Sequence, residues 1–191
     1  MTPKILAFAG STRTESFNKK LIRIAVAGAR QAGAEVTLID LRDFPLPLYD
    51  GDLEDRDGLP ENAKKLKQLF LTHDGLLISA PEYNSGITGV LKNTIDWVSR
   101  SEGDEEDLAC YIGKVAALMS ASPGFLGGLR GLFQVRWILG NIKVLMLPDQ
   151  VTVPKAHEAF NADGSLKDAK KQAAVEKLGA TLAGTVAKLK A

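Results

Sequence analysis

The sequence predicts a doubly wound α/β domain, in which helices cover both faces of a parallel sheet. Five short apolar segments lack the alternation of a half-exposed strand, as expected of parallel strands that are buried on both sides. A helical pattern follows each of them, and this alternation is typical of the class. The 191 residues show no internal repeat, linker or break in composition, so we expect a single domain over residues 1–191.

Two strands and an amphipathic helix are expected in the N-terminal part. The mostly apolar segments KILAFA, residues 4–9, and EVTLID, residues 35–40, predict the strands. Between them, apolar and small side chains recur at helical spacing from Phe17 onwards, and Gly33 ends this helix as a C′ glycine does. The Pro- and Asp-rich stretch at 44–60 cannot be regular structure throughout.

Strands and helices alternate through the rest of the chain. We expect further strands over residues 75–81, 114–120 and 142–148, and helices over residues 61–72, 89–100 and 127–139. A last amphipathic helix carries an apolar stripe formed by Val175, Leu178, Leu182, Val186 and Leu189.

Composition argues against several kinds of partner. The chain has 24 Lys and Arg against 23 Asp and Glu, and a net charge of +1 gives no reason to expect nucleic acid or an anionic membrane surface. No apolar run approaches the roughly 20 residues that span a bilayer. One cysteine, Cys110, and two histidines argue against a disulfide framework and a His/Cys metal site. We therefore expect a cytoplasmic protein without a metal.

Three loops are the most unusual stretches of the sequence. They follow the first, third and fourth predicted strands, at residues 10–18, 81–88 and 120–128. Ligands of doubly wound sheets bind at the carboxyl ends of the strands. We therefore expect these loops to form one site.

Loop 10–18 is crowded with groups that bind an anion. It offers Ser11, Arg13, Ser16 and Asn18 where a helix begins. The N–H groups and dipole of a helix N-terminus favour an anion, and an arginine can grip two phosphate oxygens at once. The loop lacks both GxGxxG and GK[ST], which favours a monophosphate over a pyrophosphate or a nucleoside triphosphate. The alternative is that Ser16 only caps the helix.

The other two loops suit the edge of a flat ring. Pro81, Glu82, Tyr83 and Asn84 directly follow a strand, and they offer a proline corner, backbone amides for the edge of a heterocycle and an aromatic cover. The alternative is a surface turn. The glycines of loop 120–128 let the chain pass close to a planar ring, although a flexible connection is the alternative there. Together with the phosphate site, these loops suggest a mononucleotide with a large flat base, and FMN is the obvious one.

Two motifs resemble those of a known family. GSTRTESFN, residues 10–18, resembles the G-S-x-R-x-x-S-x-N motif of the NADPH-dependent FMN reductase family, in the flavodoxin-like superfamily. PEYNSGITGVLKNTIDW, residues 81–97, is similar to that family's P-E-Y-N and L-K-N-x-[IL]-D-W motif. The resemblance runs from residue 4 to about 150 and is strongest to bacterial quinone, chromate and azo-dye reductases. It implies a flavodoxin-like five-stranded parallel sheet in the order 2-1-3-4-5, one FMN per subunit, and a homodimer or homotetramer.

The resemblance also implies roles for individual residues. The phosphate would be held by Ser11, Arg13, Ser16, Asn18 and the backbone of Phe17. The isoalloxazine ring would be lined by Pro81, Glu82, Tyr83 and Asn84, and its pyrimidine side approached by Ser120 or Ser122, with Gly124. Glu15 departs from expectation because it puts a carboxylate beside the phosphate, and we expect it to point outward.

The implied reaction is ping-pong. NADPH, or NADH, passes hydride to flavin N5 and leaves, and a small-molecule acceptor takes its place: a quinone, chromate or another metal oxyanion, an azo compound or free flavin. The protein supplies orientation and electrostatics while the cofactor does the chemistry, so no side chain is assigned as catalytic acid or base. The alternatives are a flavodoxin-type electron carrier and a flavin-responsive binding protein without NADPH turnover. The balanced charge argues against a carrier, since such carriers are typically strongly acidic.

The helix after loop 81–88 is expected to meet another subunit. Trp97 and Arg100 lie on a stripe that does not face the sheet. The tryptophan is therefore either half-buried against a neighbouring element or part of a subunit interface, and the resemblance favours the interface. Lys92 and Asp96 are expected to make charge contacts across it. Trp137, in the next helix, is expected in the core.

Two further side chains are expected to be structural. His73 lies near the end of a predicted helix and is expected on the surface. Cys110 flanks a strand and is expected to be buried as a small apolar group.

Overall fold

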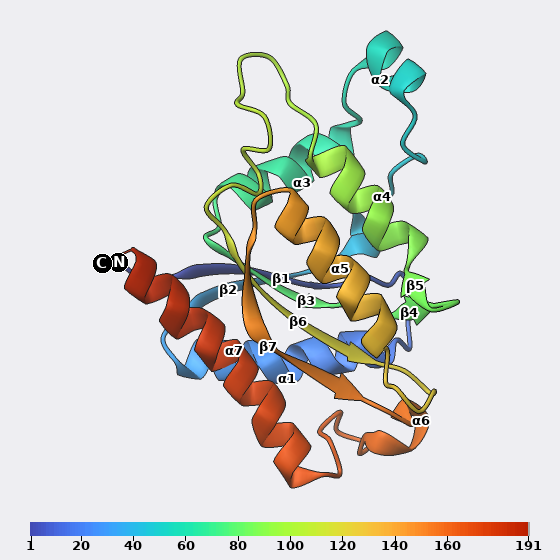
Figure 1. Cartoon of the computed structure of the whole chain (residues 1–191), viewed down its shortest axis with the longest axis vertical. Coiled ribbons are helices and arrows are strands. Elements are labelled where there is room, and N and C mark those ends of the chain that lie inside the picture. Colours follow the sequence, from blue (N-terminus) through green and yellow to red (C-terminus); the bar gives the residue numbers. More distant parts are fainter. Residues whose placement is uncertain (191) are drawn as a thin grey trace.

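The computed structural model describes residues 1–190 and shows a sheet with helices packed against it (Figure 1). In chain order the elements are β1 Lys4–Ala9, α1 Phe17–Gln31, β2 Glu35–Asp40, the 3-10 helix η1 Leu41–Asp43, α2 Gly51–Asp57, α3 Glu61–Leu71, β3 Gly75–Ser79, β4 Glu82–Tyr83, β5 Gly86–Ile87, α4 Gly89–Val98, β6 Val115–Ala121, α5 Leu129–Asn141, β7 Leu145–Val153, α6 Ala156–Ala159 and α7 Ala169–Leu189. No helix within residues 1–190 is long and apolar enough to cross a membrane.

Within the described residues, five strands form a parallel sheet in the order β2-β1-β3-β6-β7. Every residue of β3 and β6 is buried, which explains why these strands read as apolar runs. The strands β4 and β5 form a separate antiparallel hairpin. The predicted α/β class and five-stranded parallel sheet are confirmed.

The last strand begins later than predicted. We predicted a strand over 142–148, whereas β7 covers Leu145–Val153. The Val144 N–H donates to a carbonyl of α5, and Lys143 has a φ of 72°, so these residues close the helix instead of starting the strand. An irregularity in the pairing with β6 then lets β7 continue past Pro148.

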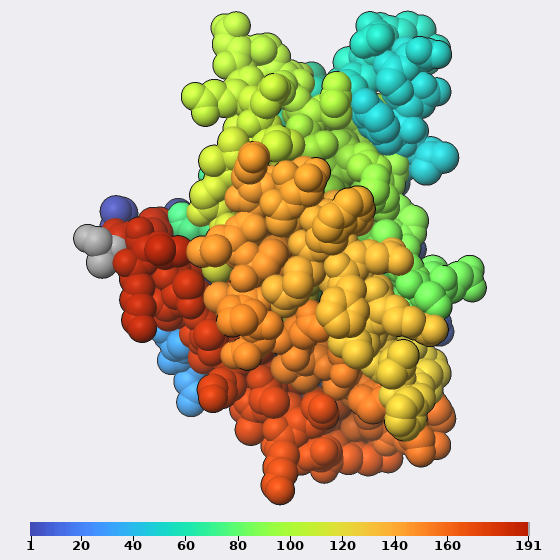
Figure 2. Space-filling model, viewed as in Figure 1, coloured from blue at the N-terminus to red at the C-terminus, as the bar shows by residue number. Residues whose placement is uncertain are grey.

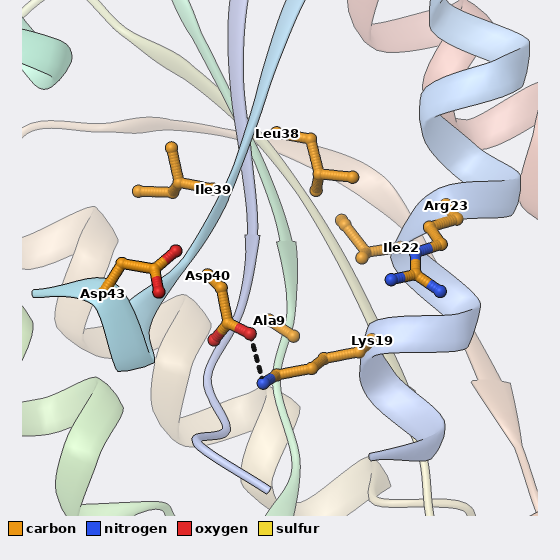
Figure 3. Close-up of a pocket in the computed structure, with 8 residues that line it drawn as sticks. All are labelled: Ala9, Lys19, Ile22, Arg23, Leu38, Ile39, Asp40 and Asp43. Atoms are coloured by element: carbon orange, nitrogen blue, oxygen red, sulfur yellow. Dashed lines mark hydrogen bonds and ion pairs between the residues drawn. The ribbon is translucent and has the colours of Figure 1, made fainter. Parts of the chain in front are cut away.

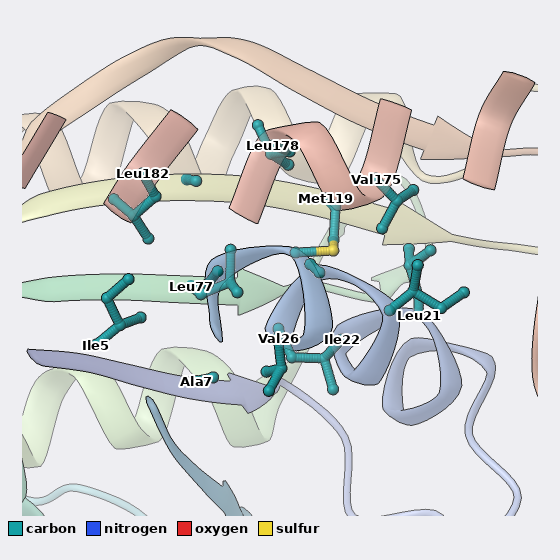
Figure 4. Close-up of a cluster of buried hydrophobic side chains, with 14 of the residues drawn as sticks. Ile5, Ala7, Leu21, Ile22, Val26, Leu77, Met119, Val175, Leu178 and Leu182 are labelled. Carbon is teal, nitrogen blue, oxygen red and sulfur yellow. The ribbon is translucent and has the colours of Figure 1, made fainter. Parts of the chain in front are cut away.

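Alternate side chains of the sheet build two apolar clusters. In the first, Ile5, Leu77 and Met119 of the sheet pack against α1 and α7 (Figure 4). In the second, Leu6 and Phe8 pack against α3, α4 and α5. Figure 1 shows these two groups of helices on opposite sides of the strands. The core therefore lies between the sheet and each group of helices.

Helices α1 and α7 touch along their backbones. A Cβ atom at Gly28 would lie 2.0 Å from the carbonyl oxygen of Glu176, and one at Gly179 would lie 2.0 Å from that of Ala25. Only glycine fits at such a distance, so this pair allows the close contact of the two helices. The contact covers the apolar face of α1, whose N-terminus lies at the carboxyl edge of the sheet.

Both tryptophans lie where they were not predicted. Trp97 is fully buried within its own chain, and its Nε1–H donates to the carbonyl of Pro47 at 2.8 Å. Trp137 is 74% exposed on α5. The predictions of Trp97 at an interface and of Trp137 in the core are therefore wrong. Helical spacing shows which residues share a face, but it does not show that the segment before α2 folds over that face of α4.

The charged residues predicted beside Trp97 have partners in their own chain. Lys92 pairs with Asp96 one turn along α4, at 2.7 Å. Arg100 pairs with Glu54 of α2, at 2.9 Å. Both ion pairs lie within one subunit, and contacts of these residues across an interface stay a prediction.

His73 and Cys110 are both buried. His73 is 7% exposed, its Nε2 lies 2.7 Å from Thr37 Oγ1, and its Nδ1 lies 2.6 Å from the carbonyl of Leu69. The prediction of a surface position for His73 is wrong, because the imidazole closes the gap between α3 and β2. Cys110 is 1% exposed, as predicted.

Candidate functional site

A cleft opens where loops 10–18, 81–88 and 120–128 meet. Its lining residues are Ser11, Arg13, Ser16, Phe17, Asn18, Pro81, Glu82, Tyr83, Ala121, Ser122 and Pro123. Two of them were not predicted, Ala121 and Pro123, because their side chains carry no polar group that would single them out. The enclosed volume is about 50 Å³, below the ~300 Å³ of a pocket that encloses a whole ligand. It has room for a small polar group, and the remainder of a larger ligand would lie on the open surface.

The first turn of α1 offers free polar groups at this cleft. Ser16 is the N-cap residue, but its hydroxyl makes no capping bond, which is contrary to the alternative that it only caps the helix. Within residues 1–190, the N–H groups of Phe17 and Asn18 have no backbone partner, as is usual in a first helical turn. The Arg13 guanidinium has no hydrogen bond or ion pair with another described residue. Such a set of donors binds anions.

Contacts from behind hold loop 10–18 in place. The Arg42 Nε donates to the carbonyl of Thr12 at 3.0 Å, and Thr88 Oγ1 donates to the carbonyl of Gly10 at 2.8 Å. Ser11 is 3% exposed, and its Oγ accepts a hydrogen bond from the N–H of Arg13 at 3.3 Å. Arg42 and Thr88 are far away in the sequence, so no local pattern could have linked them to this loop.

Glu15 points away from the cleft, as expected. Its side chain is 78% exposed and lies 3.8 Å from Lys20 Nζ. The carboxylate therefore does not oppose an anion at the first turn of α1.

Asn18 joins all three elements around the cleft. Its Nδ2 donates to the carbonyl of Ala121 at 2.8 Å, and its Oδ1 accepts from the Ala121 N–H at 3.0 Å and from Ser79 Oγ at 2.8 Å. The residue is 3% exposed. Its side chain thus joins α1, β3 and β6, and its backbone N–H and the second hydrogen of its amide are left for a ligand.

The Glu82 carboxylate faces α5 instead of the cleft. Its Oε1 accepts from Arg130 Nη2 at 2.8 Å and its Oε2 accepts from the N–H of Gly131 at 3.0 Å, and the side chain is 8% exposed. Burial by itself raises the pKa of Glu82, but the Gly131 amide and the Arg130 guanidinium outweigh burial, so the pKa lies below its ordinary value. Glu82 therefore binds loop 81–88 to the first turn of α5 as a carboxylate.

The hairpin of β4 and β5 is held against the same helix. Gln134 of α5 accepts from the N–H of Ile87 and donates to the carbonyl of Ser85, both at 3.2 Å. Asn84 has a φ of 51° and lies in the turn of the hairpin, and it does not line the cleft. Tyr83 does line the cleft and is 52% exposed, so this hairpin presents the aromatic ring.

In loop 120–128 the structure places Ser122, and not Ser120, at the cleft. Ser120 is fully buried beneath the loop, where a Cβ atom at Gly128 would lie 2.0 Å from its Oγ. The Gly124 N–H donates to Ser122 Oγ at 3.3 Å, but Gly124 does not line the cleft. The strand ends at Ala121, and only this residue and those just beyond it line the opening.

A separate hollow of about 240 Å³ lies between α1 and β2 and shares no residue with the cleft (Figure 3). In it, Lys19 Nζ lies 2.5 Å from Asp40 Oδ2. Burial raises the pKa of Asp40, but hydrogen bonds from Lys19 and the Arg42 amide outweigh it and hold the pKa below its ordinary value. This ion pair satisfies the lysine, whereas Arg23, which also lines the hollow, has no ion pair or hydrogen bond with another described residue.

The fold and the cleft define an α/β protein in which a helix end with free hydrogen-bond donors lies at the carboxyl edge of the sheet. Residues 3–158 match the NADPH-dependent FMN reductase family, and the chain belongs to that family. It is therefore an oxidoreductase, with FMN and NAD(P)H as its cofactor and co-substrate.

Named relatives agree with this assignment. The chain is 34% identical over 168 residues to an NAD(P)H-dependent FMN reductase of Pseudomonas aeruginosa, covering 87% of this chain and 86% of the relative. It is 33% identical over 167 residues to a 2-hydroxy-1,4-benzoquinone reductase of a Burkholderia species, with 87% and 86% covered. Among solved structures it is similar to the flavoenzyme NAD(P)H:(acceptor) oxidoreductase FerB of Paracoccus denitrificans, with a TM-score of 0.79, 27% identity and 98% of each chain covered.

Proposed function

We propose that the cleft holds FMN with its phosphate at the first turn of α1. The observation that carries this proposal is the set of unpaired donors there: the Arg13 guanidinium, the Ser16 hydroxyl that caps nothing, and the N–H groups of Phe17 and Asn18. The small enclosed volume of about 50 Å³ suits a phosphate. Ser11 is the fifth donor that we assign to it.

The flavin ring would then lie on the open part of the cleft. Pro81, Tyr83 and the backbone of Glu82 border it from one loop, and Ser122 from the other. Bound FMN supplies the N5 atom that accepts a hydride. The protein's part is to orient the ring and leave one face open to solvent, and no side chain in the cleft needs to move a proton.

We propose a ping-pong reaction on this open face. NAD(P)H binds first and leaves after giving up its hydride, and the acceptor then occupies the same place. Quinones are the acceptors that the named relatives favour; chromate, other metal oxyanions, azo compounds and free flavin are further candidates.

We also propose a cytoplasmic homodimer or homotetramer, as the family resemblance implies. Phe133 and Trp137 support such assembly, because they are 58% and 74% exposed one helical turn apart on α5. Aromatic residues of this kind are enriched at the centres of subunit interfaces.

A visible spectrum of the purified protein tests the proposal, followed by anaerobic addition of NADPH. We expect bound flavin, stoichiometric bleaching by NADPH, and recovery of the colour when a quinone is added. Bound flavin that resists NADPH would indicate an electron carrier instead. A protein that is colourless and takes up no added FMN would refute the assignment of the cleft.

A further inference from the structure

A fixed turn in loop 120–128 carries an exposed aromatic ring. The Gly127 N–H donates to the carbonyl of Gly124 at 3.2 Å, which closes a turn with Phe125 and Leu126 at its corners. The N–H of Lys155 donates to the same carbonyl at 3.4 Å and ties the turn to the segment after β7. Phe125 is 85% exposed, so the ring projects from a backbone that is held on both sides.

The backbone of this turn has little freedom to move. A Cβ atom at Gly127 would lie 2.7 Å from the nitrogen of Pro154, and Gly127 has a φ of 61°. Only glycine tolerates both conditions. The position of Phe125 is therefore set by the packing of the turn against the end of β7.

The turn lies beside the cleft and beside the other loop that presents an aromatic ring. Pro123, two residues before Phe125, lines the cleft, and so does Tyr83. The two loops are in contact, since a Cβ atom at Gly128 would lie 3.7 Å from that of Glu82. In Figure 2 the yellow segment that contains the turn lies uncovered at the lower right, below the green hairpin.

Loop 120–128, which borders the cleft, has no charged side chain. Residues 120–129 include no Asp, Glu, Lys or Arg. The next cation, Arg130, is paired with Glu82. A single exposed apolar residue needs no special explanation, but two exposed rings on neighbouring, fixed loops at one opening do. They suit a ligand that is flat, aromatic and neutral, and they offer nothing to an oxyanion.

We propose that Phe125, together with Tyr83, forms a stacking subsite for a neutral planar acceptor, a quinone being the simplest example. This inference rests on the proposed function and narrows it, because it selects one class among the possible acceptors. Aromatic rings attract one another in offset or edge-to-face arrangements beyond the effect of buried area. The subsite would hold the acceptor over the open side of the cleft.

Calorimetric titration with 1,4-naphthoquinone tests this, on the flavin-loaded protein without NADPH. We expect Phe125→Ala to raise the Kd about 2- to 10-fold, the range given by one aromatic contact, and Phe125→Tyr to keep the wild-type Kd. Ile112→Ala is the control, because it removes an exposed apolar side chain before the amino end of β6, at the edge of the sheet opposite the cleft. In turnover, the KM for the quinone should rise more in Phe125→Ala than the KM for ferricyanide.

Several outcomes would overturn the subsite. They are an unchanged Kd in Phe125→Ala, an equal loss of affinity in Ile112→Ala, no binding of naphthoquinone to the wild type, and a change of molecular mass in Phe125→Ala, which would show that a second copy covers the ring. Ferricyanide reduction by a wild type that does not bind naphthoquinone would leave the proposed function standing and remove only the subsite.

Discussion

Replacing Asn18 by alanine should destabilise the protein far more than a surface change on α1. The substitution removes three buried hydrogen bonds, two with the Ala121 backbone and one with Ser79 Oγ. Each such bond contributes about 1 kcal/mol, and buried groups left without a partner cost more. We therefore expect a loss of about 3–5 kcal/mol, a large part of the ~5–15 kcal/mol that stabilises a typical domain.

Urea unfolding of the flavin-free protein, followed by tryptophan fluorescence, measures this loss. Ser79→Ala is the matched control, because it removes only one of the three bonds and should cost about 1 kcal/mol. Asn18→Asp keeps the size of the side chain but turns an oxygen toward the Ala121 carbonyl, and it should not rescue the loss. A cost below about 1 kcal/mol for Asn18→Ala would show that the three loops hold together without this brace, and the reasoning would be refuted.

Three further predictions concern the cleft, the ion pair of Figure 3 and the contact of α1 with α7. Arg13→Ala should weaken FMN binding roughly 10- to 100-fold, the value of a charge-assisted hydrogen bond; titration with riboflavin, which has no phosphate, should show little change, and an equal loss would contradict the phosphate assignment. Because the pKa of Asp40 is lowered in the folded state, its stabilising contribution is present above the ordinary value of 3.8 and is lost as the pH falls through the folded value. Urea unfolding at a series of pH values should therefore show Asp40→Asn less stable than wild type at neutral pH and converging with it in acid, whereas a constant difference would rule out the carboxylate charge as the cause. Gly28→Ala should lower the free energy of unfolding by about 1–3 kcal/mol, because the new methyl group overpacks the contact. Gly184→Ala is the control: nothing lies within 4 Å of its new Cβ, and it should raise the free energy of unfolding by up to about 1 kcal/mol. Equal effects in thermal melts would mean that the helices can separate at no cost.

The sequence predicted those features correctly that depend on residue type and local spacing alone. Apolar runs without alternation predicted the buried strands, and an arginine among hydroxyls at the start of a helix predicted a set of anion donors that the structure does bring together. Glu82 shows the limit. Its position after β3 predicted that it lies at the cleft, but the direction of its carboxylate depends on Arg130 and Gly131, which belong to a later helix.

The two tryptophans show the same limit for packing. The spacing of Trp97 in α4 placed it correctly away from the sheet. A proline-containing segment without periodicity covers Trp97, and the carbonyl of Pro47 accepts a hydrogen bond from the Trp97 Nε1–H. Trp137 is apolar at helical spacing too, yet nothing in the described residues covers α5 on that side. Burial depends on which distant segment packs on a face, and a local pattern carries no such information.

The contact between α1 and α7 also has a consequence for the order in which the molecule is made. The N-terminal end of α1 contributes to the cleft, and the apolar face of this helix is closed by residues that follow every strand of the sheet in the chain. During synthesis, the face of α1 that carries Ala25 and Ala29 therefore stays uncovered until α7 leaves the ribosome. The first turn of α1, which we propose holds the phosphate, is among the first segments translated, but its helix is supported by one of the last.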